Sequence, residues 1–436
     1  MSSLAKVLQA RGWQVSGSDL VASQRTAELE RLGIKVALGH REENLNGAEL
    51  VVFSSAIARE NVELAAARRR GLPLLPRLEM LRKLAAEREA LGVAGTHGKS
   101  TTTAMLAFLL ERAGGLAPSF LIGASCPALG GNARWREGRH LVAEVDESDG
   151  YFTELALDLA VITNIGVDHL NNYGCAEAVY RAFRRFAERS KRLILNNDDG
   201  PSRRLRAELG PASLTFGIAQ KADLIATQIG QQELNTVFKL IFHGTEVGEV
   251  LLPAPGRHNV HNALAALLAG WESGLGFAQM IRALQGFTLP ERRFQVLHQD
   301  GVVIVDDYAH LPEQIEASLM AVRTGWRPRR VVAIFQPHRF SRMGSISARF
   351  VHSFDSVDRL IVTPIYPAGE PPLPGVDVTS LVRALRARGK RVEYIADQEE
   401  IIAALRREIR SGDFLISFGA GDLWRVSRSL AASFGD

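Results

Sequence analysis

Short apolar runs alternate with stretches in which apolar residues recur at helical spacing along most of the chain. Apolar runs are typical of buried strands, and apolar residues at helical spacing are typical of amphipathic helices. Regular alternation of the two implies parallel sheets whose faces are covered by helices. We therefore predict an α/β protein.

The first segment, residues 1–88, shows this alternation and an unusual start. It opens directly on a predicted helix, whereas a doubly wound nucleotide domain opens on a strand and a Gly-rich turn. Asp19, at the end of the next strand, has two interpretations: a ribose-binding acid or the cap of a turn. The predicted helices are 2–10 and 24–32, and the predicted strands are 13–17, 34–37 and 50–53.

The second segment, residues 89–290, contains a strand that starts at 91, a glycine-spaced turn at 95–98 and a helix predicted at 99–112. Backbone N–H groups of such a turn and of the first helical turn bind phosphate, and the helix dipole adds positive potential. Lys99 can reach the terminal phosphates, and the Ser100 hydroxyl suits Mg²⁺. Because Val93 stands where the common nucleotide loop has glycine, the turn is short. The predicted nucleotide contacts are Gly95, Thr96, His97, Gly98, Lys99, Ser100 and Thr101.

Four acidic residues lie at the end of the next apolar strand and just after it: Glu144, Asp146, Glu147 and Asp149. Acids at the carboxyl end of a strand lie where open α/β sheets bind ligands, and oxygen atoms are the ligands that Mg²⁺ takes. We favour Glu147 as the metal ligand; the alternative is a solvated acidic turn.

Two further groups in this segment carry candidate residues. A strand at 159–163 leads to Asp168 and His169 near the same edge of the sheet, and we interpret His169 as functional. Asn262 stands near the start of an alanine- and leucine-rich helix, where it either caps the helix or presents its amide to a purine.

The third segment, residues 291–436, again alternates strands with helices, with strands predicted at 302–305, 331–335, 360–363 and 414–418, and each strand ends in polar residues. Strand ends gather on one edge of a parallel sheet, so these side chains are expected to converge on one anionic substrate. Arg292 and Arg293 precede the segment's first strand and offer guanidinium groups to phosphate. The strand-end candidates are Asp306, Tyr308, His310, Arg339 and Arg342.

Composition sets the class of protein. A chain of 436 residues is long for one core and suggests three domains. No stretch of about 18 uncharged apolar residues and no leader is present, so we expect a cytoplasmic protein without a membrane partner. The net charge is only +4, and the sequence has no basic stretch interleaved with aromatic residues, so nucleic acid is disfavoured as a binding partner. Cys126 and Cys175 lack metal or redox spacing.

Together, these motifs resemble the Mur ligases, and the resemblance covers essentially the whole chain. Two stretches, FQPHRFSR and YPAGE, are most similar to the alanine-adding branch of the family. The other matching stretches are GTHGKSTTT, EVDESD, TNIGVDH, PGRHNVHN, RRF, DDYAH and GAGD, in the family's order.

The resemblance implies three domains: a Rossmann-like UDP-sugar domain (1–88), a central P-loop ATPase-type domain with a parallel sheet (89–290) and a Rossmann-like amino-acid domain (291–436). It implies an ATP- and Mg²⁺-dependent ligase of peptidoglycan precursor synthesis. The reaction joins L-alanine to the lactyl carboxylate of UDP-N-acetylmuramate through an acyl phosphate.

The resemblance also implies roles for single residues. Lys99 would hold the β- and γ-phosphates, Ser100 and Glu147 one Mg²⁺, and His169 a second. Asn262 matches an adenine contact, and Arg293 and Asp306 match positions near the ATP phosphates and ribose. The positions that hold the amino acid and the acyl phosphate are Tyr308, His310, Arg339 and Arg342.

Three departures from the family pattern stand out. The opening strand and glycine-rich loop are absent before Met1, and we expect a start assigned too late rather than a truncated form. Leu311 stands where a second histidine is common. Arg184 and Arg185 lie where sister ligases carry a carbamylated lysine, which the alanine-adding branch also lacks.

Alternative functions stay open at this point. Within the family, a murein-peptide recycling ligase would accept a tripeptide instead of alanine. Outside it, an inactive ATP-binding paralogue would bind nucleotide without releasing phosphate. The expected assembly is a monomer or weak dimer.

Overall fold

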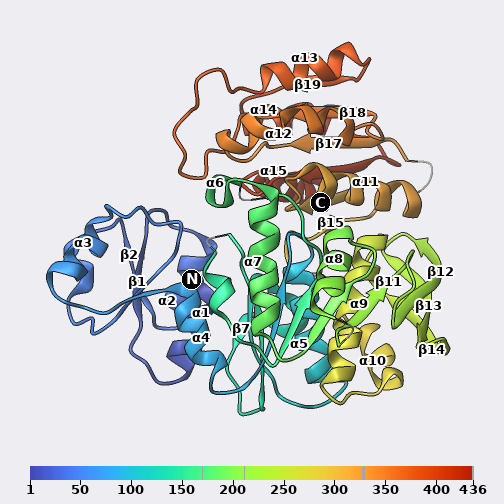
Figure 1. Ribbon diagram of the computed structural model, residues 1–436. Coiled ribbons are helices and arrows are strands. Elements are labelled where there is room, and N and C mark those ends of the chain that lie inside the picture. Colours follow the sequence, from blue (N-terminus) through green and yellow to red (C-terminus); the bar gives the residue numbers. More distant parts are fainter. Residues whose placement is uncertain (149, 169, 211, 327–328, 435–436) are drawn as a thin grey trace. The chain divides into compact units, whose positions relative to one another are not determined.

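The structure is a computed structural model that describes residues 1–148, 150–168, 170–210, 212–326 and 329–434. These residues form two compact units, and Figure 1 labels those of their helices and strands for which there is room. Unit 1 holds Met1–Thr227, Lys239–Glu249 and His261–Phe287, and unit 2 holds Gln228–Phe238, Val250–Val260 and Thr288–Asp436. The α/β prediction is confirmed in both units, while the predicted domain limits at 88/89 and 290/291 stay predictions.

The N-terminal part of unit 1 forms two separate parallel pairs of strands, β1 with β2 and β3 with β4. The single sheet that alternation predicts is therefore not continuous among the described residues. The strand predicted at 13–17 lies later, because Trp13 donates its N–H to the Leu8 carbonyl and belongs to the turn that ends the first helix. The elements are α1 (Ser2–Ala10), β1 (Ser16–Asp19), α2 (Gln24–Arg31), β2 (Lys35–Leu38), β3 (Val51–Phe53), α3 (Val62–Arg69), β4 (Leu74–Pro76) and α4 (Arg77–Ala85).

The central strands form one sheet in the order β14-β13-β12-β11-β10-β9-β5-β8-β6-β7. Strand β5 lies between β8 and β9 and is parallel to both. The strands are β5 (Glu89–Ala94), β6 (Ser119–Cys126), β7 (Gly131–Arg134), β8 (His140–Glu144), β9 (Leu159–Ile162), β10 (Leu193–Asn196), β11 (Leu214–Gly217), β12 (Leu224–Gln232), β13 (Asn235–Phe242) and β14 (Thr245–Leu252). The last three contribute residues to both units. They were not predicted from the sequence, and neither were β6, β7, β10 and β11.

Helix α5 is buried on all sides, from Ser100 through Leu110. Its residues include hydroxyl and apolar side chains on every face, so it lacks the polar stripe of a surface helix and packs inside the unit. The predicted helix at 99–112 is confirmed. The helices of this part are α5 (Lys99–Arg112), α6 (Leu170–Tyr173), α7 (Ala176–Arg189), α8 (Gly200–Leu209), α9 (Arg257–Glu272) and α10 (Phe277–Leu284).

Unit 2 contains a sheet in the order β15-β16-β20-β17-β18-β19. Only the pair β15 and β16 is antiparallel, and the other pairs are parallel. The elements are β15 (Gln295–His298), β16 (Val303–Asp307), α11 (Pro312–Gly325), β17 (Val331–Phe335), α12 (Phe340–Ser353), β18 (Arg359–Val362), α13 (Thr379–Ala387), β19 (Val392–Tyr394), α14 (Gln398–Glu408), β20 (Phe414–Phe418) and α15 (Trp424–Phe434).

Both faces of the unit 2 sheet are buried, which explains why the sequences of its strands are continuous apolar runs. Helices α11, α12 and α13 contribute to the core on one face, and α14 and α15 contribute to the core on the other. The register places Asp307 beside Phe418, and Phe418 beside Phe335. The ends of β16, β20 and β17 therefore meet at one edge, as predicted.

No helix among the described residues has the length and apolar character needed to cross a lipid bilayer.

Candidate active site

The loop between β5 and α5 lies at the carboxyl edge of the central sheet. Val93 of β5 is paired with Glu144 of β8, and Ala94 is paired with Ile162 of β9. The acids that follow β8 and the residues that follow β9 therefore flank the loop. This is the arrangement that the sequence predicts.

Two glycines allow the loop to pass close to its neighbours. Gly95 has a φ of +135°, and a Cβ there would lie 2.1 Å from Thr163 Oγ1. Gly98 has a φ of +83°, and a Cβ there would lie 2.3 Å from Asn262 Oδ1. An L side chain at either position combines an unfavourable backbone conformation with a collision.

The middle of the loop is held by the segment after β9. His97 donates its backbone N–H to Asn164 Oδ1 at 3.0 Å, and its carbonyl accepts from Thr163 Oγ1 at 2.6 Å. Thr96 Oγ1 accepts from the N–H of Gly166 at 2.7 Å. The loop is thus positioned before any ligand arrives, which lowers the entropic cost of binding.

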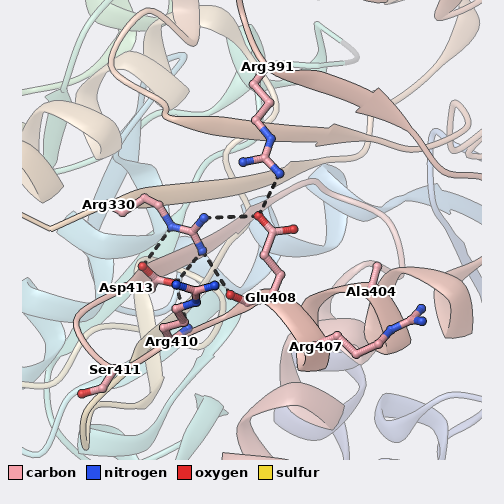
Figure 2. A pocket seen from close by; sticks show the side chains of 8 residues that line it. All are labelled: Arg330, Arg391, Ala404, Arg407, Glu408, Arg410, Ser411 and Asp413. Atoms are coloured by element: carbon pink, nitrogen blue, oxygen red, sulfur yellow. Dashed lines mark hydrogen bonds and ion pairs between the residues drawn. The ribbon is translucent and has the colours of Figure 1, made fainter.

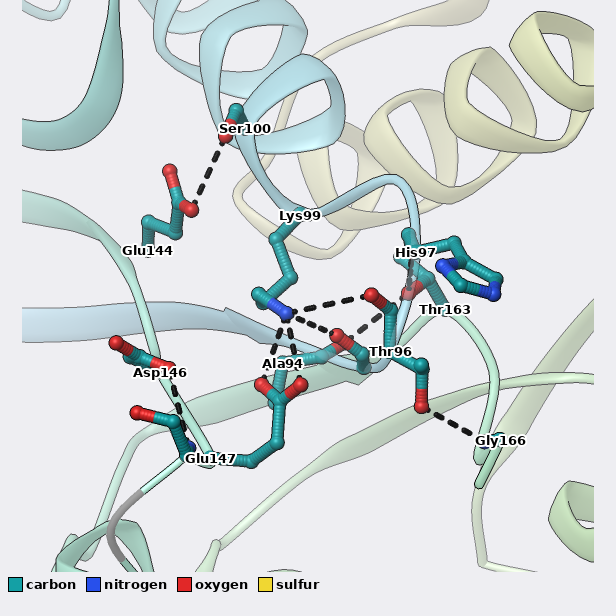
Figure 3. Close-up of polar contacts among 12 residues, drawn as sticks. Ala94, Thr96, His97, Lys99, Ser100, Glu144, Asp146, Glu147, Thr163 and Gly166 are labelled. Atoms are coloured by element: carbon teal, nitrogen blue, oxygen red, sulfur yellow. Dashed lines mark hydrogen bonds and ion pairs between the residues drawn. The ribbon is translucent and has the colours of Figure 1, made fainter. Parts of the chain in front are cut away.

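Lys99 points back across the loop, and Figure 3 shows its ammonium group at the centre of the site. Its Nζ donates to the Gly95 carbonyl at 2.6 Å and lies 2.9 Å from both carboxylate oxygens of Glu147. The Glu147 side chain is only 3% exposed. Burial lowers the pKa of Lys99, but the nearby carboxylates, Glu147 foremost, outweigh burial and raise it. Lys99 is therefore a cation at neutral pH.

Ser100 pairs with a different acid from the one that we favoured. Ser100 Oγ donates to Glu144 Oε1 at 3.0 Å, and Glu144 Oε2 accepts from the N–H of Gly123 at 2.6 Å. Figure 3 shows these two residues on one side of Lys99 and Glu147 on the other. The acid beside the Ser100 hydroxyl is thus Glu144, and Glu147 is the partner of Lys99.

The Ser100 and Glu144 oxygens fit a magnesium ion that is held mainly by a nucleotide. Mg²⁺ in phosphate sites takes one or two protein oxygens, and phosphates and water supply the rest. The described residues contain no group of three or more His, Cys, Asp or Glu side chains able to hold a metal ion alone. The donor set therefore suits a nucleotide-bound cation and not a self-sufficient metal centre.

Asn262 lies inside the first turns of α9, which begins earlier than predicted, at Arg257. Its Oδ1 accepts from Thr102 Oγ1 at 3.2 Å, and the side chain faces Gly98. Thr101, in the first turn of α5, is 5% exposed. Asn262 thus supports the back of the phosphate loop, and its predicted contact with adenine stays a prediction.

His169 and Asp149 lie outside the described residues. The expectation of a second magnesium ion at His169 therefore stays a prediction.

In unit 2, the carboxyl edge of the sheet gathers the other predicted residues. Asp306, which we expected near the ribose, is 2% exposed. It accepts from Arg292 Nε at 3.1 Å and from Ser417 Oγ at 3.0 Å. Burial raises the pKa of Asp306, against the opposing effect of the Arg292 charge.

Arg292 uses its whole guanidinium group within unit 2. Besides Asp306, it donates to the carbonyls of Gly421 at 3.0 Å and Gly419 at 2.6 Å. Both arginines also lie over the ring of Tyr308, Arg292 at 5.2 Å and Arg293 at 4.8 Å from its centroid. The adjacent arginines therefore share the aromatic contact, and Arg292 in addition ties β16 to the loop after β20.

Histidine and tyrosine side chains cluster beside Tyr308. The His310 ring lies 5.3 Å from that of Tyr308 and 5.5 Å from that of His338, measured between centroids. His338 stacks on Tyr366 with an angle of 9° between the planes. His310 Nδ1 lies 3.0 Å from the Tyr308 carbonyl.

The two predicted arginines lie next to this cluster. Arg342 Nη1 lies 3.1 Å from His338 Nδ1. Burial, followed by the charges of Arg342 and Arg339, lowers the pKa of His338 to about 4. Arg339 has a positive φ of +71°, and its Nη1 lies 3.9 Å from Glu370 Oε1. The cluster is therefore positively charged, with a neutral His338 at neutral pH.

Sequence reasoning missed two of these residues as participants: Arg292 as the partner of Asp306, and His338. The pairing of Arg292 with Asp306 leaves no periodic signal in sequence. His338 did stand in a polar strand end, in the stretch FQPHRFSR, and that position was the available signal.

Comparison with known proteins agrees with this geometry. Residues 1–89, 93–270 and 292–421 match the family models described as Mur ligase family, catalytic domain; Mur ligase middle domain; and Mur ligase, glutamate ligase domain. The chain is 40% identical to a UDP-N-acetylmuramate–L-alanine ligase of Syntrophotalea carbinolica, over 99% of this chain and 95% of that protein.

Solved structures give the same fold. A UDP-N-acetylmuramate–alanine ligase from Thermotoga maritima matches with a TM-score of 0.87 and 28% identity, covering 100% of this chain and 96% of that one. A murein peptide ligase from Psychrobacter arcticus matches with a TM-score of 0.72 and 22% identity, over 100% and 96% of the two chains, which shows the fold alone. Full-length similarity and a shared fold establish that the chain belongs to the Mur ligase family.

Proposed function

We propose that the chain is a UDP-N-acetylmuramate–L-alanine ligase that uses ATP and Mg²⁺ in peptidoglycan precursor synthesis. The observation that carries this proposal is 40% identity, over nearly the whole of both chains, to proteins of that name. The geometry of unit 1 supports the nucleotide part independently, because it combines a pre-positioned phosphate loop, a charged lysine and a pair of oxygens suited to Mg²⁺.

In unit 1, Lys99 and the backbone N–H groups at the start of α5 bind the ATP phosphates. Ser100 and Glu144 would hold a Mg²⁺ ion, which would neutralise charge on the phosphates. Lys99 must leave the Gly95 carbonyl to reach a phosphate, and Glu147 keeps the ammonium group charged and close to the loop. Glu147 thus acts here through Lys99, whereas the sequence favoured it as a metal ligand.

The reaction proceeds in two transfers. The lactyl carboxylate of UDP-N-acetylmuramate attacks the γ-phosphorus of ATP, so that ADP leaves and an acyl phosphate forms. The amine of L-alanine then attacks the acyl carbon, loses a proton and expels inorganic phosphate, which leaves an amide. Both transfers bring anions together, so cationic groups must stabilise the charge as it develops.

In unit 2, residues at the carboxyl edge of the sheet bind the amino acid. Tyr308, His310, Arg339 and Arg342 hold the L-alanine carboxylate and the acyl phosphate. Arg293 contacts the ATP phosphates. Asp306 acts mainly by holding Arg292, because its carboxylate is buried, and a ribose contact requires this pair to open. Asn262 would contact adenine, and His169 would hold a second Mg²⁺.

The substrates also indicate where the protein works. ATP and UDP-sugars are cytoplasmic metabolites, so we place the enzyme in the cytoplasm, with small-molecule substrates, no nucleic-acid or membrane partner, and a monomeric or weakly dimeric state.

Phosphate release by the purified chain tests this proposal. The assay contains ATP, Mg²⁺ and UDP-N-acetylmuramate, with and without L-alanine, and the new amide is identified by mass spectrometry. Release that depends on both UDP-N-acetylmuramate and L-alanine is expected.

Two other results would replace the proposal. Product formation with a tripeptide but not with L-alanine would identify a murein-peptide recycling ligase. ATP binding without substrate-dependent phosphate release would identify an inactive ATP-binding paralogue.

A further inference from the structure

The parallel strands of unit 2 begin at the edge opposite to the one that carries Tyr308 and His338. A hollow of about 730 Å³ opens there, and Figure 2 shows the side chains around it. We call it the arginine basin; it is lined by Arg330, Arg391, Ala404, Arg407, Glu408, Arg410, Ser411 and Asp413.

The floor of the arginine basin is electrically balanced. Arg330 donates from Nη2 to Asp413 Oδ2 at 2.7 Å and from Nη1 to Glu408 Oε1 at 3.2 Å. The buried Arg359 also pairs with Glu408, and with Glu393 at 2.9 Å. Arg330 further donates to the Glu408 carbonyl, at the C-terminus of α14. The carboxylates of the floor are thus already paired with arginines.

The rim of the basin carries excess positive charge. Arg391, Arg407 and Arg410 are exposed. Arg391 shares Glu408 with the floor at 3.3 Å, and Arg407 Nε donates to a carbonyl of its own helix. Arg410 donates its backbone N–H to Asp413 Oδ2 at 2.9 Å, and the charge of its side chain attracts the same carboxylate at longer range. The residues that line the basin include four arginines and two acids, Glu408 and Asp413, a net charge of +2.

We propose that the arginine basin binds a small anion that carries two or more phosphate groups. Guanidinium groups recognise phosphate oxygens through paired N–H donors, and several of them around one hollow favour a multiply charged ligand. Ala404 is the only apolar side chain in the lining. The basin therefore recognises charge and offers no surface on which a base or acyl chain would pack.

The arginine basin is separate from the proposed substrate side of unit 2. Arg330 precedes β17 and Gln336 follows it, so the length of a five-residue strand, roughly 16 Å, lies between the two edges. A ligand in the basin does not compete for the groups at the carboxyl edge. The inference goes beyond the proposed ligase activity and does not depend on it.

Arginine-specific labelling with phenylglyoxal tests the inference at the level of single residues. The full-length protein is labelled with and without inorganic pyrophosphate at constant ionic strength, and modified arginines are identified by peptide mass spectrometry. This readout separates the basin from the phosphate loop of unit 1, which is also expected to bind pyrophosphate. We expect pyrophosphate to slow modification of Arg391 and Arg410 at least threefold, and orthophosphate to protect them less.

A matched pair of variants completes the test, with pyrophosphate binding measured by calorimetry. Every protein in this experiment also carries Lys99→Ala, because this substitution weakens binding of pyrophosphate to the phosphate loop of unit 1. The variant Arg391→Gln/Arg407→Gln/Arg410→Gln removes the rim charges, and the control Arg181→Gln/Arg184→Gln/Arg185→Gln removes three exposed charges from α7. We expect the first to raise the Kd for pyrophosphate at least tenfold and the control to change it less than threefold. Unprotected basin arginines, or equal effects of the two variants, would overturn the inference.

Discussion

Lys99 and Glu147 form a buried ion pair in which Nζ lies 2.9 Å from both carboxylate oxygens. The same ammonium group donates to the Gly95 carbonyl at 2.6 Å. The phosphate loop therefore keeps its cation inside the site, held by an acid from the neighbouring strand end. A buried lysine without that acid would lose its charge more readily.

Replacing Lys99 by alanine removes the cation from the phosphate cradle. We expect the variant to lose about 3 kcal/mol or more of transition-state stabilisation, roughly a hundredfold in kcat/KM for phosphate release. Lys191→Ala, at an exposed residue, is the control and should retain normal turnover. Near-normal turnover of Lys99→Ala would show that the cradle is wrongly assigned.

Glu144 and Glu147 are predicted to differ in their dependence on magnesium. Glu144→Gln weakens the cation site with Ser100, so the Mg²⁺ concentration for half-maximal activity should rise about tenfold. Glu147→Gln removes the partner of Lys99, so kcat should fall while the Mg²⁺ requirement changes little. Titration of activity with Mg²⁺ distinguishes the two, and the reverse pattern would restore Glu147 as the metal ligand.

Gly98→Ala tests the close approach of the loop to Asn262. Both Gly98 and Gly39 have a φ near +84°, but a Cβ at Gly39 meets nothing within 4 Å, whereas at Gly98 it lies 2.3 Å from Asn262 Oδ1. Gly39→Ala should cost only the backbone strain, about 1–2 kcal/mol. Gly98→Ala should lower the Tm further and weaken ATP binding at least tenfold. Equal behaviour of the two variants would show that the loop is not confined by α9.

Substitution of Arg292 is predicted to affect mainly stability, and substitution of Arg293 mainly activity. Arg292→Ala leaves the carboxylate of Asp306 buried without its cation, which should destabilise unit 2 by about 3 kcal/mol. Arg293→Ala should leave the Tm within about 2 °C of wild type and reduce kcat/KM at least tenfold. Thermal unfolding and phosphate release measure both effects. A stable Arg292→Ala protein would show that the ion pair is dispensable.

His338 should make the stability of unit 2 depend on pH. Its pKa in the folded protein is about 4, below the ordinary value of 6.5, so the unfolded chain binds the proton more readily. The stabilising contribution is complete above pH 6.5 and is lost as the pH falls toward 4, by about 3 kcal/mol at most. The Tm of His338→Gln should therefore fall less than that of wild type over this range. An equal fall of Tm with pH in wild type and His338→Gln would contradict the low pKa assigned to His338.

Much of the architecture follows from local pattern. The helix at 99–112 and the strands at 331–335 and 414–418 were predicted at their observed limits, because strong apolar periodicity and a glycine turn mark them. Strands β12, β13 and β14 were missed. Each has a mixed pattern of buried and exposed residues with many polar side chains, which is a weak signal for a strand.

The sequence by itself determined the family, the α/β class and the set of polar residues at the strand ends, because spacing along the chain encodes them. Only the tertiary structure decided the partners: Glu144 beside Ser100, Glu147 beside Lys99, and Arg292 on Asp306. Glu144 and Glu147 are three residues apart and share a motif, so sequence could not rank them. Their distances to α5 depend on the register of β8 against β5, and register is a property of packing between strands.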